Sequence, residues 1–187
     1  SAASDVYKRQ NRQSGYVPGD VTLEYETKKC GYDRGRMFTI DAMDNIESAG
    51  IAFGRLSGEF LRTKVAPELD AYRLAGYAQI SGIKTASADL ADGKAALAAL
   101  RTARGEIENA EANLATCYLF INPTVYGLIE DLDTTASKKA IEGFAGIVKV
   151  PSGRFYNKIA LTASGEGGFS KAAGALAMNF LIVDKQA

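Results

Sequence analysis

The sequence of 187 residues predicts an α+β fold, and three patterns support that prediction. Polar and apolar residues alternate over 21–28, as in a strand with one face in water. Apolar residues recur every three or four positions over 44–65, as on one face of a helix. Residues 116–131 join a nearly continuous apolar run, typical of a buried strand, to a helix start. We therefore expect a β-ribbon, a long helix and a mixed α/β lobe.

Composition excludes several classes of protein. The chain has no His, so Ser-His-Asp and Cys-His nucleophile systems and His-based zinc or haem sites are absent. The two cysteines, Cys30 and Cys117, form neither a disulfide framework nor a CxxC metal clip, and we expect reduced thiols. Formal charge is zero, with 22 basic and 22 acidic residues, which argues against a dedicated nucleic-acid or membrane-surface binder. We predict no catalytic residue, no cofactor and no metal, and hence not an enzyme.

The first 42 residues divide into two parts. Residues 1–15 are polar and aperiodic, so we expect a disordered or artefactual N-terminus. Residues 16–42 predict the β-ribbon, with one strand over 21–28, a turn over 31–35 and a second strand over Met37–Asp41. A two-stranded ribbon is only marginally stable alone, so it needs a surface to lie on.

The long helix is predicted within residues 43–88. Asp41 or Asp44 should be the N-cap, and Glu47 has the capping-box spacing from Asp44. Pro67 should end or kink the helix. Helical character resumes over Glu68–Ala78, and Gly82–Ala88 breaks it. The apolar stripe of the helix consists of Ile46, Ala49, Phe53, Leu56 and Phe60.

Residues 89–187 predict the mixed lobe. An alanine-rich helix over Ala91–Arg104 should start at Asp89 and stop near Gly105. Strand Thr116–Ile121 should lead into helix Thr124–Asp131, with Asn122 as N-cap and Pro123 at N1. Further strands are expected at Ile147–Val150, Phe155–Leu161 and Asn179–Val183, and a loop at Gly165–Gly168.

Charges of both signs alternate along the ribbon and the long helix. An exposed helix laced with salt bridges accounts for this pattern, with little stability from each pair. A sharper hypothesis is that the ribbon and the helix meet other copies of the chain, with balanced charges fixing the register. The candidate inter-subunit contacts are Glu24, Glu26, Lys28, Arg34, Arg36, Arg55, Glu59 and Arg62.

Four blocks of sequence resemble one protein family. They are Tyr32–Arg73, Tyr118–Ile129 (YLFINPTVYGLI), Val148–Tyr156 (VKVPSGRFY) and Gly167–Val183. In this order they resemble the major capsid proteins of tailed bacteriophages with the Hong Kong 97 fold. The resemblance covers roughly residues 15 to 183, and no block is a catalytic motif.

The resemblance implies a capsid subunit with three structural parts. Residues 16–42 would form the E-loop over a neighbouring subunit, 43–88 the spine helix and part of the P-domain, and 89–187 the A-domain. Covalent crosslinks known in the family cannot be assigned here to Lys28, Lys29 or Asn157. The chain lacks the family's N-terminal arm and final P-domain strands, so it is expected to be truncated at both ends.

The resulting functional expectation is a virion capsid protein, assembled in the cytoplasm of a bacterial host. It would assemble with itself into hexamers and pentamers and bind portal and scaffold proteins. It would contact packaged double-stranded DNA non-specifically, and it would not bind a membrane. Two alternatives stay open. One is the shell of an encapsulin-type nanocompartment, and the other is a small α/β ligand-binding or enzyme domain using polar groups near Asn122 and Thr124.

Overall fold

In the computed structural model, the described residues are 23–25, 27, 31–39, 43, 46, 51–162 and 168–185. They include both helices and strands, which confirms the general α+β class. The chain divides into two units, residues 1–39 and 40–187, and each is treated by itself below.

The predicted ribbon is not formed where residues 16–42 are described. Residues 23–25, 27 and 31–39 belong to no helix or strand, so the strands expected there are wrong at these positions. Alternation of polar and apolar residues makes a segment suitable for a sheet, but a strand forms only when a second strand accepts its hydrogen bonds. The predicted segment 1–15 lies outside the described residues.

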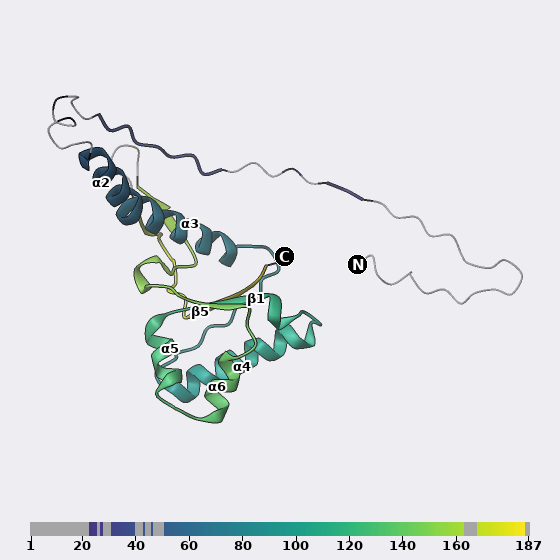
Figure 1. Ribbon diagram of the computed structural model, residues 1–187. Coiled ribbons are helices and arrows are strands. Elements are labelled where there is room, and N and C mark those ends of the chain that lie inside the picture. Colours follow the sequence, from purple (N-terminus) through teal and green to yellow (C-terminus); the bar gives the residue numbers. More distant parts are fainter. Residues whose placement is uncertain are drawn as a thin grey trace, which may run out of the picture. The chain divides into compact units, whose positions relative to one another are not determined.

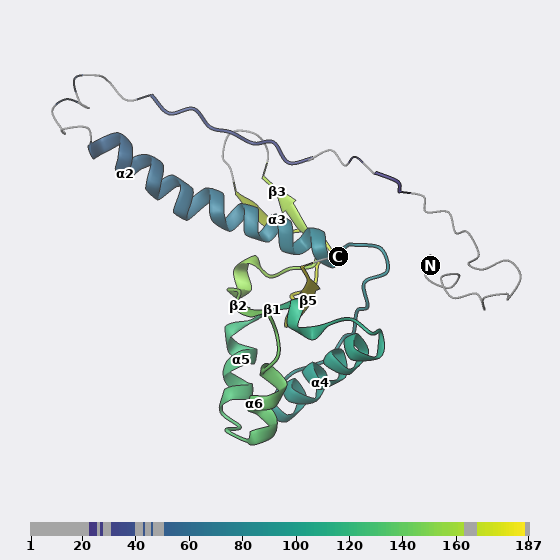
Figure 2. The same ribbon diagram turned by 45° about the vertical axis from the view of Figure 1, so that its right-hand side comes forward.

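A helical run continues from Ile51 to Ala78 in three pieces (Figure 2). These are α2 (Ile51–Phe60), a π-helical turn η1 (Leu61–Val65) and α3 (Ala66–Ala78). Pro67, expected to end or kink the helix, therefore does not end it, and the regular α-helix is interrupted just before it by the π turn. A proline ring in an α-helix collides with the carbonyl four residues earlier. Here the wider π turn directly precedes it, with the Ala66 amide donating to the Leu61 carbonyl five residues back, which accommodates the ring.

Helix α3 is the anchored part of this run. Ala71, Leu74 and Ala75 are buried on its inner side. The Glu68 carboxylate is also buried and accepts a hydrogen bond from the Gly168 amide at 2.6 Å. Asp70 forms an ion pair with Arg154 at 3.3 Å. These contacts hold α3 to segments far along the chain.

The central sheet has the strand order β2-β1-β5. Strands β1 and β5 are labelled in Figure 1, and all three strands in Figure 2. Strand β1 (Cys117–Ile121) lies in the middle, parallel to β2 (Gly146–Lys149) and antiparallel to β5 (Phe180–Asp184). The strands expected over 116–121, 147–150 and 179–183 are therefore confirmed to within about a residue or two, the usual uncertainty at element ends. A separate hairpin pairs β3 (Ile159–Leu161) with β4 (Phe169–Lys171), so only the end of the strand expected over 155–161 forms.

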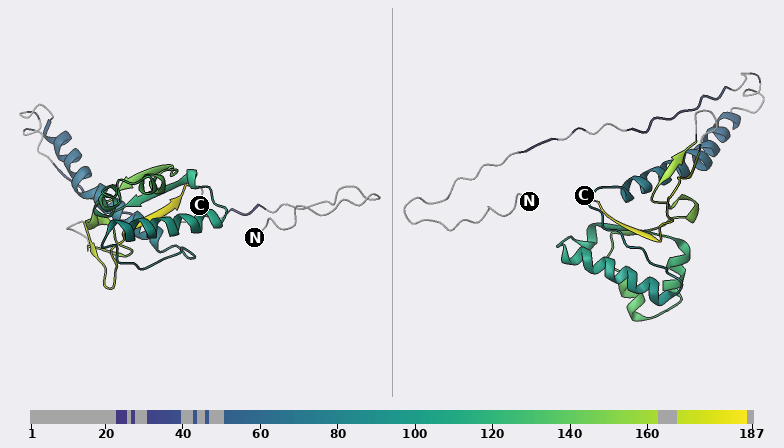
Figure 3. Two further views of the ribbon diagram at one scale, coloured as in Figure 1. Left: turned by 90° about the horizontal axis from the view of Figure 1, so that it is seen from below. Right: turned by 180° about the vertical axis from the view of Figure 1, so that it is seen from behind.

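Three helices cover one face of the sheet (Figure 3). They are α4 (Gly93–Asn109), α5 (Pro123–Glu130) and α6 (Thr135–Ile141). Leu119 and Ile121 of β1 are completely buried against Leu100 of α4 and Ile129 of α5. The opposite face is covered by α3 and by the 3-10 turn η3 (Ser152–Arg154) with its neighbours. The buried residues there are Leu74, Val150, Phe155 and Leu181.

The ends of the helices in this lobe differ in part from expectation. Asn122 caps α5 as predicted, its side chain accepting from the Thr124 amide at 2.9 Å. Helix α4 is capped by Asp92 rather than Asp89, and it continues through Gly105 to Asn109. A short 3-10 turn, η2 (Leu114–Thr116), then precedes β1.

The two glycines of α4 provide a matched test of this packing. A Cβ at Gly93 would collide with the main-chain oxygen of Leu128, whereas a Cβ at Gly105 meets nothing within 4 Å. We expect Gly93→Ala to lower the free energy of unfolding by about 1–3 kcal/mol because the helix pair must separate. Gly105→Ala should raise it by about 0.5–1 kcal/mol through helix propensity. Urea unfolding of both variants checks this, and equal effects would contradict the described contact between α4 and α5.

Candidate functional site

Large apolar side chains are exposed on the first part of the helical run. The exposed fraction is 56% for Phe53 and 38% for Leu56, while Phe60 is half-buried. With about 100° between successive residues, these three positions lie on one side of α2. We call this set the α2 stripe. Its exposure contrasts with the inner side of α3, where Ala71, Leu74 and Ala75 are buried.

The predicted charged contacts of the helix lie on another side. Arg55, Glu59 and Arg62 follow one another at spacings of four and three, which places them away from the α2 stripe. Glu59 and Arg62 pair with each other at 2.7 Å. Both side chains are largely exposed, so this pair adds little stability. Arg55 is exposed as well.

The remaining predicted contacts lie in the unit of residues 1–39. Glu24 is exposed, and Arg34 is half-buried. The Arg36 guanidinium lies 5.6 Å from the centre of the Phe38 ring, a cation–π contact between neighbours in sequence. Glu26 and Lys28 lie outside the described residues. Among the eight candidates, the described structure brings Glu59 and Arg62 together, and it leaves the predicted contacts between copies untested.

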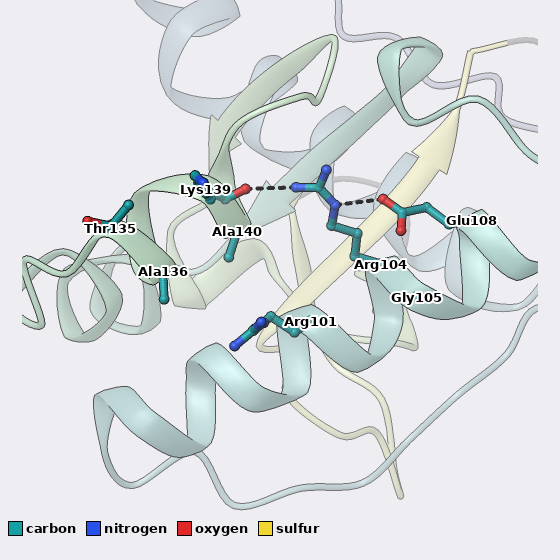
Figure 4. Close-up of a pocket in the computed structure, with 8 residues that line it drawn as sticks. All are labelled: Arg101, Arg104, Gly105, Glu108, Thr135, Ala136, Lys139 and Ala140. Atoms are coloured by element: carbon teal, nitrogen blue, oxygen red, sulfur yellow. Dashed lines mark hydrogen bonds and ion pairs between the residues drawn. The ribbon is translucent and has the colours of Figure 1, made fainter.

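A groove between α4 and α6 is a feature that the sequence prediction missed (Figure 4). Its volume is about 570 Å³, and three cationic residues line it against one acidic residue. Arg104 donates to the carbonyls of Lys139 and Glu142 at the end of α6, at 2.8 and 2.9 Å, and to the Glu108 carboxylate at 2.9 Å. Arg104 thus ties the two helices together. The lining consists of Arg101, Arg104, Gly105, Glu108, Thr135, Ala136, Lys139 and Ala140.

The groove was missed because α6 was not predicted. Its sequence TASKKAI has no apolar stripe, and the helix is stabilised at its start by a capping box between Thr134 and Ser137. The Thr-x-x-Ser spacing was the available indication, since Ser here replaces the usual Glu or Gln. On α4, the spacing of Arg101, Arg104 and Glu108 already placed these side chains on one side of a helix.

The strand-to-helix turn at 122–124 has a structural role in this fold. The Asn122 side chain caps α5. The main-chain N–H of Asn122 donates to the Asn179 carbonyl at 2.9 Å, which joins the turn to the segment before β5. Hollows in the described surface lie away from this turn. One is the α4–α6 groove. Another, of about 460 Å³, lies between α3 and β3, and its lining consists of Tyr72, Ala75, Gly76, Gln79, Ile159 and Leu161.

The chemistry expected of Cys117 is that of a packing residue. Its side chain is 2% exposed, and the thiol donates to the Asn113 carbonyl at 3.4 Å. Burial, and secondarily the Asp184 carboxylate, raises the pKa of the Cys117 thiol above its ordinary value, so the reactive thiolate is disfavoured. Among the described residues, no group of three or more Cys, Asp or Glu side chains is placed to hold a metal ion.

The raised pKa of Cys117 predicts slow thiol chemistry and a pH effect. In a Cys30→Ser variant, Cys117 should react with a disulfide reagent only after unfolding in urea. Its contribution to stability should be constant below the ordinary pKa of 9.0 and fall as pH rises above it, because the unfolded thiol ionises first. Cys117→Ala should lack that alkaline loss. Rapid reaction of the folded Cys30→Ser variant would contradict the described burial.

Comparisons with known proteins give no relative of this chain. No family model, no curated protein and no solved structure matches this chain. In the part of the chain that the structure describes, no helix has the length and apolar content that a membrane span requires.

Proposed function

We propose that the chain is a structural subunit of a phage capsid, which assembles with copies of itself into an icosahedral shell around double-stranded DNA. Hexamers and pentamers would be its assembly units, and portal and scaffold proteins its further partners, in the cytoplasm of a bacterial host. The proposal combines the resemblance of the four sequence blocks with one structural observation, the exposed α2 stripe.

The α2 stripe supports a macromolecular partner. Phe53 and Leu56 lie on a helix surface, which offers a small molecule no enclosed site, whereas a second protein surface can cover several such residues at once. Fully burying one large apolar side chain contributes about 1.5–3 kcal/mol, which is weak for a single contact. In a closed shell every subunit repeats the contact, so weak contacts add up.

The charges of the chain favour a second copy as that partner. The formal charge is zero, so copies do not repel one another as strongly charged chains do. Arg55, Glu59 and Arg62 present both signs on another side of the same helix, where mixed charges can fix the register with a neighbouring copy. A partner of one strong charge would find no complementary surface on this helix.

Assembly of Phe53→Ser provides the direct test. Phe53 is more than half exposed in the single chain, so we expect its replacement to leave the urea unfolding midpoint unchanged. Loss of the ring from the contact between copies should weaken self-association by about tenfold or more, as for an apolar interface anchor. Sedimentation velocity and electron microscopy of the full chain measure the association and the particles.

Leu176→Ser is the matched control. Leu176 is exposed to a similar degree, 63%, but lies in the segment before β5 rather than on the helix. Its replacement should leave self-association within about twofold of wild type, since scattered surface leucines are ordinary. Equal loss in both variants would show non-specific aggregation, and a wild-type chain that remains monomeric at every concentration would overturn the proposal. Particles that enclose a protein rather than DNA would favour the encapsulin-type alternative.

A further inference from the structure

The α4–α6 groove contains positive charge that the fold itself does not use. Arg104 is engaged with Glu108 and with the end of α6. Arg101 and Lys139 are exposed at the same groove, and Figure 4 shows Arg101 extending from α4 into the gap beside α6. Neither Arg101 nor Lys139 has an acidic side chain within ion-pair distance among the described residues.

The groove also has room for a ligand group. Small residues form part of its lining, namely Gly105 of α4 and Ala136 and Ala140 of α6. A Cβ added at Gly105 would meet nothing within 4 Å, so the space above the glycine is open. The Thr135 hydroxyl at the edge is exposed and can donate a further hydrogen bond.

We propose that this groove binds phosphate groups of the backbone of double-stranded DNA. The inference rests on the proposed function for the choice of DNA and on the groove for the choice of phosphate. Arginine, lysine and hydroxyl side chains are the groups that contact phosphate oxygens in nucleic-acid complexes. Lys94, exposed seven residues before Arg101 on the same side of α4, continues the positive row along the helix.

The lining favours a nucleic-acid backbone over an acidic peptide. Peptide grooves hold their ligands through apolar or aromatic anchors in pockets. No large apolar side chain lines the α4–α6 groove, so a peptide would find charge there but no anchor. A phosphodiester backbone needs only cations and hydrogen-bond donors, and it binds without reading sequence. Weak, salt-sensitive and sequence-independent binding therefore follows from the geometry.

The salt dependence of duplex binding tests the groove. Anisotropy of a labelled 30-base-pair duplex would be measured against salt, from about 25 to 200 mM, with the full chain in the Phe53→Ser background so that assembly does not contribute. We expect Arg101→Gln with Lys139→Gln to weaken binding about tenfold at low salt. The slope of log K against log salt should decrease by about 1.8, for two lost phosphate contacts.

Two further experiments distinguish duplex binding in the groove from a general effect of removing positive charge. Arg73→Gln with Lys158→Gln removes the same charge from positions that do not line the groove, and should leave the slope nearly unchanged. Gly105→Gln keeps every charge but fills the open space, and should weaken duplex binding at least threefold. Equal losses for the two charge-removing pairs, or an unaffected Gly105→Gln, would overturn the groove as the site.

Competing ligands distinguish the source of the phosphate. Inorganic phosphate should compete only at millimolar concentration, and poly-glutamate of matched charge should bind more weakly than the duplex. Binding of inorganic phosphate without binding of the duplex would overturn the assignment to DNA, and tighter binding of poly-glutamate would assign the groove to an acidic protein. Failure of the chain to assemble, with duplex binding as expected, would reject the capsid proposal and leave the groove intact.

Discussion

Strand β1 must be covered on both of its faces, and the arrangement of unit 40–187 follows from that requirement. Leu119 and Ile121 point to the layer of α4, α5 and α6, where they are completely buried. Phe120, between them, packs on the opposite side with the core around Leu74 and Phe155. Because successive side chains of a strand alternate, one apolar pentapeptide connects two separate cores. Helix α3 belongs to this lobe through the second core.

The sequence predicts best where a local rule and a tertiary contact agree. The buried strand and the helix capped by Asn122 appear as expected, because the apolar run, the cap and Pro123 act within a few residues of one another. Gly105 was expected to stop a helix and Pro67 to end or kink one, yet both lie inside helical runs. A single glycine costs a helix only about 0.5–1 kcal/mol, which the core packing of α4 through Ala96 and Leu100 outweighs, and the π turn accommodates Pro67. Propensity alone could not foresee either outcome.

The α2 stripe and the α4–α6 groove could be predicted from the sequence only in part. The spacing of Phe53, Leu56 and Phe60 predicts a helix face, but whether that face enters the core or remains exposed depends on partners that spacing cannot specify. The alternation in residues 21–28 has the same ambiguity, since a strand without a partner is not a strand. The α4–α6 groove could not be predicted without α6, a short polar helix stabilised by the capping box of Thr134 and Ser137. No hydrophobic pattern in the sequence predicts this helix.

The pairing of β1 with β5 also has a consequence for how the chain folds during synthesis. Leu181 of β5 completes the core that covers Leu74 of α3, which the ribosome produces about a hundred residues earlier. Until β5 emerges, β1 has one open edge, and α3 can bury its inner side only incompletely. Contacts between residues so distant in sequence form late, because their loops must close first. The nascent helix therefore exposes apolar surface on two sides, and a chaperone or rapid completion of β5 would protect it from premature association.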